Sequence, residues 1–322
     1  MNTPSLGIDM AQLSFSVALW FDSKRCVKAL FENTPIGFRH LARWLRQHFT
    51  GQVRAAVEST NTYAEPLVEW LHAAGHQVHV LNPERIAHYA RSLGQRNKTD
   101  PADAVTIARY LATHEATPWR PAPPEQRHLR GLTRARHQLV VYSNQLRNQL
   151  RTADPVARLH LQAVLNTITQ QLKKLLCEIV AHLKAHPLLG DQVRRLRTCK
   201  GVGLLTAAIT IAELPPITTE SDPRALCAWA GLTPRRWQSG QTEWPARLCR
   251  KGNIYLRQAL YMPALVAKRH NPLLRAFAKR LSENGKSNPA ILGAISHKML
   301  RILIGLLRSN TDFDPHWSLQ NI

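Results

Sequence analysis

Apolar and polar residues alternate near the start of the chain with the two-residue period of a half-buried β-strand. Leu13, Phe15, Val17 and Leu19 alternate there with small and hydroxyl-bearing residues. Apolar runs at 6–9, 26–31, 52–57 and 76–81 predict further strands, and helical periodicity predicts helices over 35–48, 63–73, 100–113 and from Asn82 onward. Strands come first and then alternate with helices, so we expect a mixed α/β sheet.

The pattern changes after residue 115 from strands to long helices. Four prolines within 116–126 predict a linker. Leu132, Leu139 and Leu146 recur every seven residues, a second apolar stripe follows over 168–179, and Asp154-Pro155 separates the two. The segment 127–190 therefore predicts a helical hairpin or an interrupted coiled coil, either as a plain bundle or as an oligomerisation element. Residues 191–322 predict a mainly helical domain, with helices at about 254–270 and 290–308.

Charge is distributed unevenly over these parts. The chain of 322 residues has a formal net charge of +22, yet residues 1–119 hold 12 Lys and Arg against 10 Asp and Glu. Residues 120–200 hold 15 against 4, and residues 201–322 hold 16 against 7. A basic excess of this size favours a polyanionic partner such as nucleic acid, the alternative being charge that only maintains solubility.

Cysteine usage and the N-terminus bear on the compartment. The five cysteines include no closely spaced pair, which argues against a disulfide framework and against a zinc ribbon. The first ten residues carry no basic-then-apolar signal, and no uninterrupted apolar run approaches about 18 residues. We therefore expect a cytoplasmic protein that is associated with the nucleoid and not with a membrane.

Four acids in the nearly neutral N-terminal part form the candidate chemistry. Asp9 ends the first strand, Glu58 ends the fourth, and Asp100 and Asp103 lie one helical turn apart in NKTDPADA. Clustered carboxylates repel one another unless hard cations lie among them, so the set predicts Mg²⁺ or Mn²⁺, with two ions about 4 Å apart for phosphodiester chemistry. Taken singly, Asp100 also suits a helix N-cap, Asp103 the helix dipole, and Glu58 an exposed strand end.

Two other groups of residues have weaker sequence signals. Lys200, Gly201 and Gly203 belong to a Gly-Val-Gly turn between a basic stretch and an apolar helix, which is typical of phosphate-binding helix-hairpin-helix elements as well as of ordinary turns. His72, His76 and His79 have a metal-like spacing, but the expected change from helix to strand between them indicates a chance pattern.

Several motifs together resemble one family. GIDM, AAVEST and NKTDPADA resemble the RuvC-like domain of the DEDD transposases of bacterial insertion sequences, which are described as bridge-RNA-guided recombinases. LRTCKGVGLLTAAITIAEL and WAGLTPRRWQSGQTEWPARLCRKGNIYLRQAL are similar to the family's downstream regions. The resemblance implies a ribonuclease H-like, RuvC-like domain over 1–115, a linker over 116–126, a helical coiled-coil segment over 127–190 and a helical transposase domain over 191–322.

The resemblance also implies roles for individual residues. It makes Asp9, Glu58, Asp100 and Asp103 metal ligands, and Ser239 the nucleophile that forms a covalent link to a DNA phosphate. Alone, Ser239-Gly240 reads as a turn. Basic residues near these positions are candidate nucleic-acid contacts: Lys98, Arg235, Arg236, Arg247, Arg250 and Lys251. Trp237 and Trp244 suit either base stacking or packing.

The expected function is therefore site-specific transposition. The resemblance implies donor and target DNA as substrates, a structured guide RNA, and a homo-oligomer, either dimer or tetramer. Two alternatives stay open at this point. One is a metal-dependent hydrolytic nuclease of the junction-resolvase type, and the other is a nucleic-acid-binding protein without catalysis.

Overall fold

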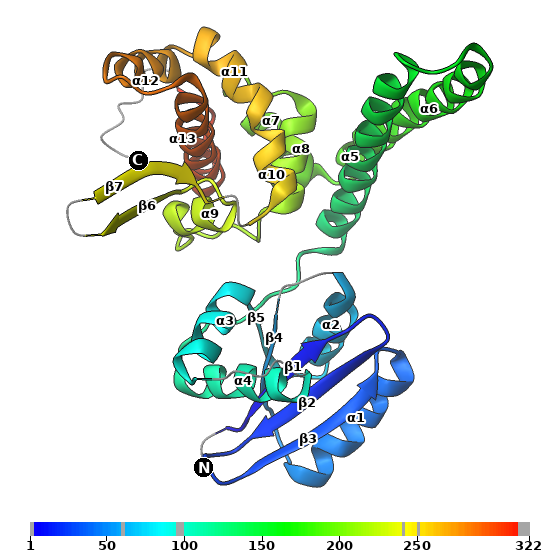
Figure 1. Ribbon diagram of the computed structural model, residues 1–322, viewed down its shortest axis with the longest axis vertical. Helices are drawn as coiled ribbons and strands as arrows, with labels where there is room; N and C mark the ends of the chain where they lie inside the picture. Colours follow the sequence, from blue (N-terminus) through cyan, green and yellow to red (C-terminus); the bar gives the residue numbers. More distant parts are fainter. Residues whose placement is uncertain (1–2, 59–61, 95–99, 240–241, 250–251, 315–322) are drawn as a thin grey trace. The chain divides into compact units, whose positions relative to one another are not determined.

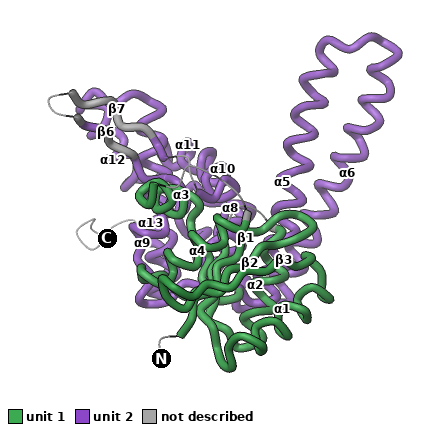
Figure 2. Tube along the Cα trace, turned by 60° about the horizontal axis from the view of Figure 1, so that its bottom comes forward, with its two compact units in different colours: residues 1–121 green, residues 122–322 purple. Residues whose placement is uncertain are grey.

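The computed structural model describes residues 3–58, 62–94, 100–239, 242–249 and 252–314. Within these ranges, the side chains of residues 62, 100, 235–237, 239 and 242–247 are not described. The chain divides into two compact units, 1–121 and 122–322, which are coloured separately in Figure 2. Each unit is built around hydrophobic side chains of its own.

A five-stranded sheet forms the centre of the first unit. Its strands lie in the order β3-β2-β1-β4-β5, and their bounds are β1 Ser5–Met10, β2 Ser14–Trp20, β3 Cys26–Glu32, β4 Arg54–Glu58 and β5 Gln77–Leu81. β1 pairs antiparallel with β2 and parallel with β4, so the sheet is mixed, as the sequence pattern predicts. This sheet with its helices is compatible with a ribonuclease H-like domain.

Helices cover both faces of the sheet (Figure 1). α1 (Pro35–His48) and α2 (Glu65–Ala73) bury Leu41 and Leu67 against the strand residues Leu6 and Ile8. α3 (Pro83–Ser92) and α4 (Asp100–Thr113) cover the opposite face, where Ile107 packs near Ala56 and Leu81. A 3₁₀ turn, Thr62–Ala64, precedes α2. The side chain of Asn82 accepts from the N–H of Glu84, which confirms the predicted cap of α3.

Two long helices open the second unit. α5 (Pro124–Leu150) and α6 (Pro155–Ala185) pack against each other and lie antiparallel in both ribbon and tube views (Figures 1 and 2). Asp154 caps α6 by accepting from Val156, and Pro155 follows in the first turn, so the predicted break lies where the structure has it. The structure shows the helical hairpin, and supercoiling of the two helices stays a prediction.

The rest of the second unit is mostly helical. The helices are α7 Pro187–Arg197, α8 Leu204–Glu213, α9 Pro223–Trp229, α10 Ile254–Ala259, α11 Tyr261–His270, α12 Pro272–Glu283 and α13 Asn288–Ser309. α13 buries ten residues, including Ile295, Met299 and Leu303, in a core shared with α8 and α11. α13 is the one described helix that is long and apolar enough to cross a membrane, but 61% of its apolar window is buried inside the protein. It is the core helix of this unit.

Three features of the C-terminal part differ from the sequence expectation. The segment expected to be a loop contains a hairpin of β6 (Pro234–Ser239) and β7 (Thr242–Leu248). The helix expected over 254–270 is two helices, because Pro263 lies in the first turn of α11 and cannot continue the bonding of α10. α12 is a helix that the sequence analysis missed.

Candidate functional site

The register between β1 and β4 places two of the predicted acids side by side. Ile8 is the partner of Val57 in this parallel pair, so the next residues along, Asp9 and Glu58, lie at the same level of adjacent strands. Both acids are half-buried. The sheet therefore brings together residues that are far apart in the sequence, as the strand-end argument predicts.

Asp9 and Glu58 share the face of the sheet that α4 covers. Side chains alternate between the faces of a strand, so Asp9 lies on the face of Gly7, and Glu58 on the face of Ala56. Ala56 packs against residues of α4, and Gly7 contacts the backbone of α4 directly. Both carboxylates are therefore directed to the α4 side of the sheet.

Gly7 determines how closely α4 approaches β1. A Cβ atom at Gly7 would lie 2.1 Å from the carbonyl oxygen of Ala104 and 2.3 Å from the backbone nitrogen of Ala108. Only glycine permits this approach, because those atoms belong to the helix backbone and cannot rotate away. Asp103 precedes Ala104, so the contact at Gly7 brings half-buried Asp103 to the strands that carry Asp9 and Glu58.

The donor chemistry of this face fits divalent cations. Asp9, Glu58 and Asp103 offer carboxylate oxygens, the ligands that Mg²⁺ and Mn²⁺ prefer. Asp100 begins α4 one turn before Asp103, but its side chain lies outside the description, and so does Lys98. Among the described residues, no three His, Cys, Asp or Glu side chains lie close enough together to hold an ion.

Ser239 lies in the second unit, at the end of the β6–β7 hairpin. It is the last residue of β6, and its backbone pairs with Thr242 of β7. Arg235 pairs with Arg247 and Trp237 with Trp244, and the register shifts between these pairs, so that Arg236 lies opposite two residues of β7, Pro245 and Ala246. The expected loop serine is therefore a strand residue beside the turn, and the basic residues of the segment belong to the same hairpin. Arg250 and Lys251 lie outside the described residues.

The base of the hairpin is closed by tight backbone packing. The N–H of Cys249 donates to the carbonyl of Thr233, joining the two ends of the hairpin. Gly252 then adopts φ +136°, and a Cβ there would lie 2.1 Å from the carbonyl oxygen of Trp229. Asn253 follows, donates its N–H to that carbonyl, and caps α10 by accepting from Leu256.

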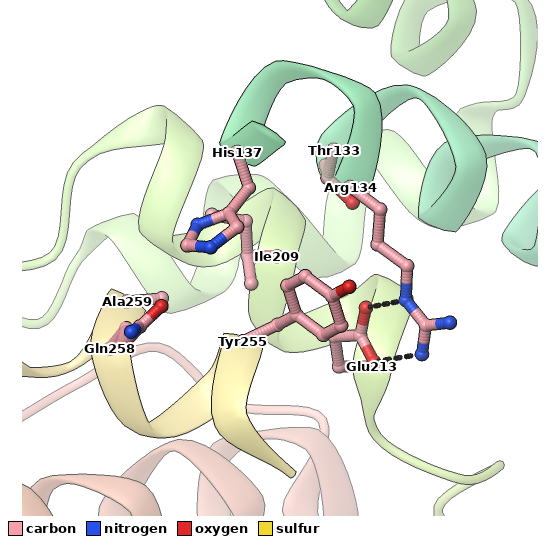
Figure 3. Close-up of a pocket in the computed structure, with 8 residues that line it drawn as sticks. All are labelled: Thr133, Arg134, His137, Ile209, Glu213, Tyr255, Gln258 and Ala259. Carbon is pink, nitrogen blue, oxygen red and sulfur yellow. Dashed lines mark hydrogen bonds and ion pairs between the residues drawn. The ribbon is translucent and has the colours of Figure 1, made fainter. Parts of the chain in front are cut away.

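An ion pair between Glu213 and Arg134 (Figure 3) lies next to Asn253. Glu213, at the end of α8, is 3% exposed and accepts two hydrogen bonds from Arg134 of α5, at 2.7 and 2.8 Å. The Nδ2 of Asn253 donates to the same carboxylate at 2.7 Å. Arg134 also stacks over Tyr255, 4.7 Å from the ring centroid, beside a cavity of about 120 Å³ that His137 and Gln258 help to line. Glu213 thus joins α5, α8 and α10.

One glycine of the Gly-Val-Gly turn has a role in packing. Gly201 adopts φ +106°, and its Cβ position lies 3.0 Å from the carbonyl oxygen of Pro263 in α11. Gly201 is therefore needed for packing inside the unit. Gly203 precedes α8 with open space around its Cβ position, and Lys200 is exposed, so these two residues are the members of the turn that a phosphate can reach.

The three histidines of the metal-like pattern have separate roles. His79 is 1% exposed in β5, and burial together with Arg54 lowers its pKa below 6.5. The Nδ1 of His76 accepts from the N–H of Val53, and burial lowers the pKa of His76 as well. The edge of the His72 ring contacts Trp119. The described residues contain no metal-binding group that includes them.

The sequence analysis overlooked two residues that position the site. Gly7 is part of the GIDM motif, and an apolar strand interrupted by glycine is a known sign of close backbone approach. Glu213 carried a second signal, because it is an isolated acid at the end of an otherwise apolar helix. Its partner Arg134 lies 79 residues away, and no local pattern connects them.

Comparison with known proteins identifies the family. Residues 6–153 match a DEDD transposase family of the IS110 type, and residues 193–279 match a family described as Transposase IS116/IS110/IS902. The chain is similar to the pilin gene-inverting protein of Moraxella bovis, with 29% identity over 322 residues that cover 98% of each chain. It is also similar to the transposase for insertion sequence element IS1111A of Coxiella burnetii, with 25% identity covering 59% of each chain.

These matches cover both units. The relative from Moraxella bovis matches along its whole length, so the similarity is not confined to one shared domain. The chain therefore belongs to the IS110/IS116/IS902 transposase family, whose members are DNA recombination enzymes.

Proposed function

We propose that this chain is a site-specific recombinase that cuts and rejoins DNA with metal-bound carboxylates and a serine nucleophile. The observation that carries the proposal is the register of β1 and β4, which places Asp9 beside Glu58 on the face that α4 covers. The contact of α4 with Gly7 adds Asp103 to the same face. Phosphoryl transfer needs such a concentration of oxygen ligands.

Asp9, Glu58, Asp100 and Asp103 would hold one or two Mg²⁺ or Mn²⁺ ions. Bound ions supply charge neutralisation at the phosphate and stabilise the developing charge on the leaving oxygen. The chain's own residues hold the ligands rigidly, because Asp9 and Glu58 lie on paired central strands and Asp103 on a helix with buried Ala104 and Ala108 beneath it. A rigid scaffold keeps ligand geometry constant during strand exchange.

Ser239 would supply the nucleophile. Its hydroxyl oxygen forms a bond to phosphorus while the bond from phosphorus to one deoxyribose oxygen breaks; the serine gives up its proton, and the released DNA hydroxyl takes one up. Attack by a hydroxyl of the other DNA strand reverses these changes and releases the serine. The covalent link preserves the energy of the phosphodiester for rejoining, which a hydrolytic reaction would lose.

The second unit would bind the nucleic acids. Residues 122–322 hold 30 Lys and Arg against 11 Asp and Glu, whereas residues 1–121 hold 13 against 10. The exposed Lys200 and the arginines of the β6–β7 hairpin would contact phosphates. A structured guide RNA that selects donor and target, and a dimer or tetramer that completes the several cleavages, belong to the same proposal.

A covalent trapping assay tests this function. Purified protein is incubated with Mg²⁺, flanking RNA of the element and labelled junction DNA, and the products are separated on a denaturing gel. We expect a protein–DNA adduct with the unmodified chain and none with Ser239→Ala or Asp9→Asn. Thr242→Val serves as the matched control for Ser239, because Thr242 is its cross-strand partner and also carries a hydroxyl. Asp22→Asn, in an exposed turn of the same unit, is the control for Asp9.

The same gel distinguishes the two alternatives. Cleaved DNA without any adduct indicates a metal-dependent nuclease and removes Ser239 from the mechanism. Neither cleavage nor adduct, together with tight DNA binding and no carboxylate-dependent binding of Mn²⁺, indicates a nucleic-acid-binding protein. An adduct that persists in Ser239→Ala contradicts the proposed nucleophile directly.

A further inference from the structure

Three cationic side chains and one histidine gather where α12 and α13 pack together. Lys298 of α13 lies over the ring of Phe277 in α12, with its Nζ 4.5 Å from the ring centroid. The guanidinium of Arg280 lies 5.5 Å from the same centroid. Arg301 follows Lys298 by one helical turn, and His297 precedes Arg301 by one turn. We call Arg280, Lys298 and Arg301 the α12–α13 cationic cluster.

The cluster has no compensating acid within the described part of the chain. None of its three members forms an ion pair there, and the Nε of Arg301 is buried without a hydrogen-bond partner. Lys279, on the same helix as Arg280, differs because it pairs with Glu283 at 3.9 Å. The nearby acid Asp222 caps α9 by accepting from the N–H groups of Arg224 and Ala225.

Mutual repulsion within the cluster affects its protonation. Burial first, and then Arg280 and Arg301, lower the pKa of Lys298. Burial first, and then Arg301 and Lys298, lower the pKa of His297. An arrangement of like charges costs free energy in the absence of an anion, and a bound anion removes that cost. The exposed position of Arg280 leaves one side of the cluster open to a ligand from solvent.

The cluster lies on α13 near the base of the β6–β7 hairpin. Gly293 of α13 packs against Leu248 of β7, with its Cβ position 3.1 Å from a methyl carbon of that leucine. Gly293, His297 and Arg301 follow one another at four-residue intervals and therefore lie along one stripe of the helix. At 1.5 Å per residue, Arg301 lies about 12 Å along the axis from Gly293, which is roughly three to four base pairs of duplex DNA.

We propose that the α12–α13 cationic cluster is a binding site for the phosphate backbone of duplex DNA beside the β6–β7 hairpin. The inference rests on the proposed function, because it assigns the cluster to the DNA that Ser239 would attack. The hairpin and the cluster belong to the same unit and share α13, so DNA held by the cluster passes close to the strand that carries Ser239. The partly buried, preorganised cations favour phosphate contact over free solvation.

The salt dependence of DNA binding tests the proposal. We compare the full chain with Arg280→Gln/Lys298→Gln in fluorescence anisotropy titrations of a labelled duplex across a series of NaCl concentrations. Loss of two phosphate contacts lowers the slope of log K against log salt by about 1.8 and weakens binding at least about tenfold near 0.1 M salt. The control is Lys279→Gln/Lys286→Gln, which removes the same charge from α12 and its C-terminal end at exposed positions.

The control variant decides the interpretation. A change of slope in the cluster variant alone supports the site, and restoration by Arg280→Lys/Lys298→Arg strengthens it. Equal changes in both double variants indicate diffuse electrostatic attraction and overturn the proposal. Circular dichroism melting of each variant verifies folding, and Arg280→Gln alone, at an exposed position, still requires a slope change of about 0.9.

Two further experiments distinguish failure of this proposal from failure of the proposed function on which it rests. The same titrations with structured RNA in place of DNA must leave the cluster variant close to the unmodified chain, and an effect confined to RNA overturns the assignment to DNA. The covalent trapping assay reports on Ser239 independently. A chain that forms no adduct but still shows the cluster-specific slope retains the DNA site and loses only the proposed nucleophile.

Discussion

Gly7 controls the carboxylate face although it carries no functional group. Its missing Cβ lets the backbone of α4 contact β1, and this contact sets where Asp103 lies relative to Asp9 and Glu58. A hydrogen atom is the one substituent small enough for this contact. The spacing of three acids is therefore fixed by a residue that cannot bind a metal.

We expect Gly7→Ala to abolish strand cleavage. The new methyl group would have to move α4 by an ångström or more, and a displacement of that size at a reacting centre lowers rates by about 100-fold. Cleavage of labelled junction DNA measures the effect. Gly131→Ala in α5, where a Cβ meets open space, is the control and should be neutral or more stable by up to about 1 kcal/mol. Full cleavage by Gly7→Ala contradicts the role given to this contact.

In the second unit, Glu213 likewise determines how neighbouring helices are placed. It accepts hydrogen bonds from Arg134 and Asn253, so three helices depend on one carboxylate. We expect Glu213→Gln to lower the free energy of unfolding by about 2–4 kcal/mol, because it leaves the charge of Arg134 unpaired. Asp191→Asn, whose pair with Arg194 is exposed, should cost less than about 0.5 kcal/mol. Urea denaturation measures both values, and equal losses would show that Glu213 is no anchor.

At the scale of elements, the histidines in and next to β5 make the stability of the first unit depend on pH. His76 lies just before β5 and His79 in its middle, and burial lowers the pKa of both below 6.5. Protonation of His76 also removes the acceptor for the N–H of Val53. The unfolded chain therefore binds more protons than the folded chain just below pH 6.5, so stability falls as the pH falls through that range.

Hydrogen exchange measures this dependence. We expect the opening free energy of β5 amides, corrected for intrinsic exchange, to be constant above about pH 7 and to fall between pH 6.5 and the lowered folded values. His76→Gln/His79→Gln should flatten that slope whatever its effect on absolute stability. His40→Gln, an exposed substitution in α1, should leave it unchanged. A slope that survives the double substitution assigns the pH dependence to other groups.

The elements that the sequence predicted well have local signals. Asn82-Pro83 and Asp154-Pro155 are cap-and-proline starts, and both begin helices in the structure. The alternation from Leu13 to Leu19 located β2 but not its burial, because helices cover this strand on both faces and Leu13, just before it, is 80% exposed. α12 had the same kind of signal, with Asn271 as cap and Pro272 behind it, so its omission was avoidable.

The β6–β7 hairpin had no such signal. Each of its strands contains a proline, a residue type that is depleted in strands of larger sheets. In a two-stranded sheet each strand has an unpaired edge, where proline and charge are tolerated. The sequence pattern therefore could not predict that Ser239 lies in a strand. The acids of the first unit were predictable because strand ends in a parallel pair meet at one edge, whereas the contact through Gly7 depends on tertiary packing.

At the scale of the whole molecule, the candidate metal-binding carboxylates lie in one unit and most of the net positive charge lies in the other. The first has a net charge of +3 and carries the carboxylates, and the second has +19 and carries the hairpin. Residues 120–123, at the boundary between them, have no regular secondary structure, and Pro121 is exposed. This segment is a suitable place for a specific protease site.

We expect cleavage at such a site, inserted after Pro121, to separate DNA binding from the first unit. The fragment that contains 122–322 should bind duplex DNA within about threefold of the intact chain and with the same salt slope, because it retains nearly all of the basic excess. The fragment 1–121 should bind at least about 100-fold more weakly. Gel filtration followed by anisotropy titration measures both. Tight binding by the small fragment contradicts the division.

The short hairpin also limits how this protein can change in length. Successive strand residues face opposite sides of a sheet. One residue inserted into β6 between Arg236, where the register shifts, and Ser239 would therefore reverse the side of the hairpin on which position 239 lies. Two inserted residues would restore the side and displace the serine by about 7 Å along the strand. Functional relatives should therefore differ in the sequence of the hairpin but keep the number of residues between position 236 and the serine. We expect this spacing to vary less than the residue types within it.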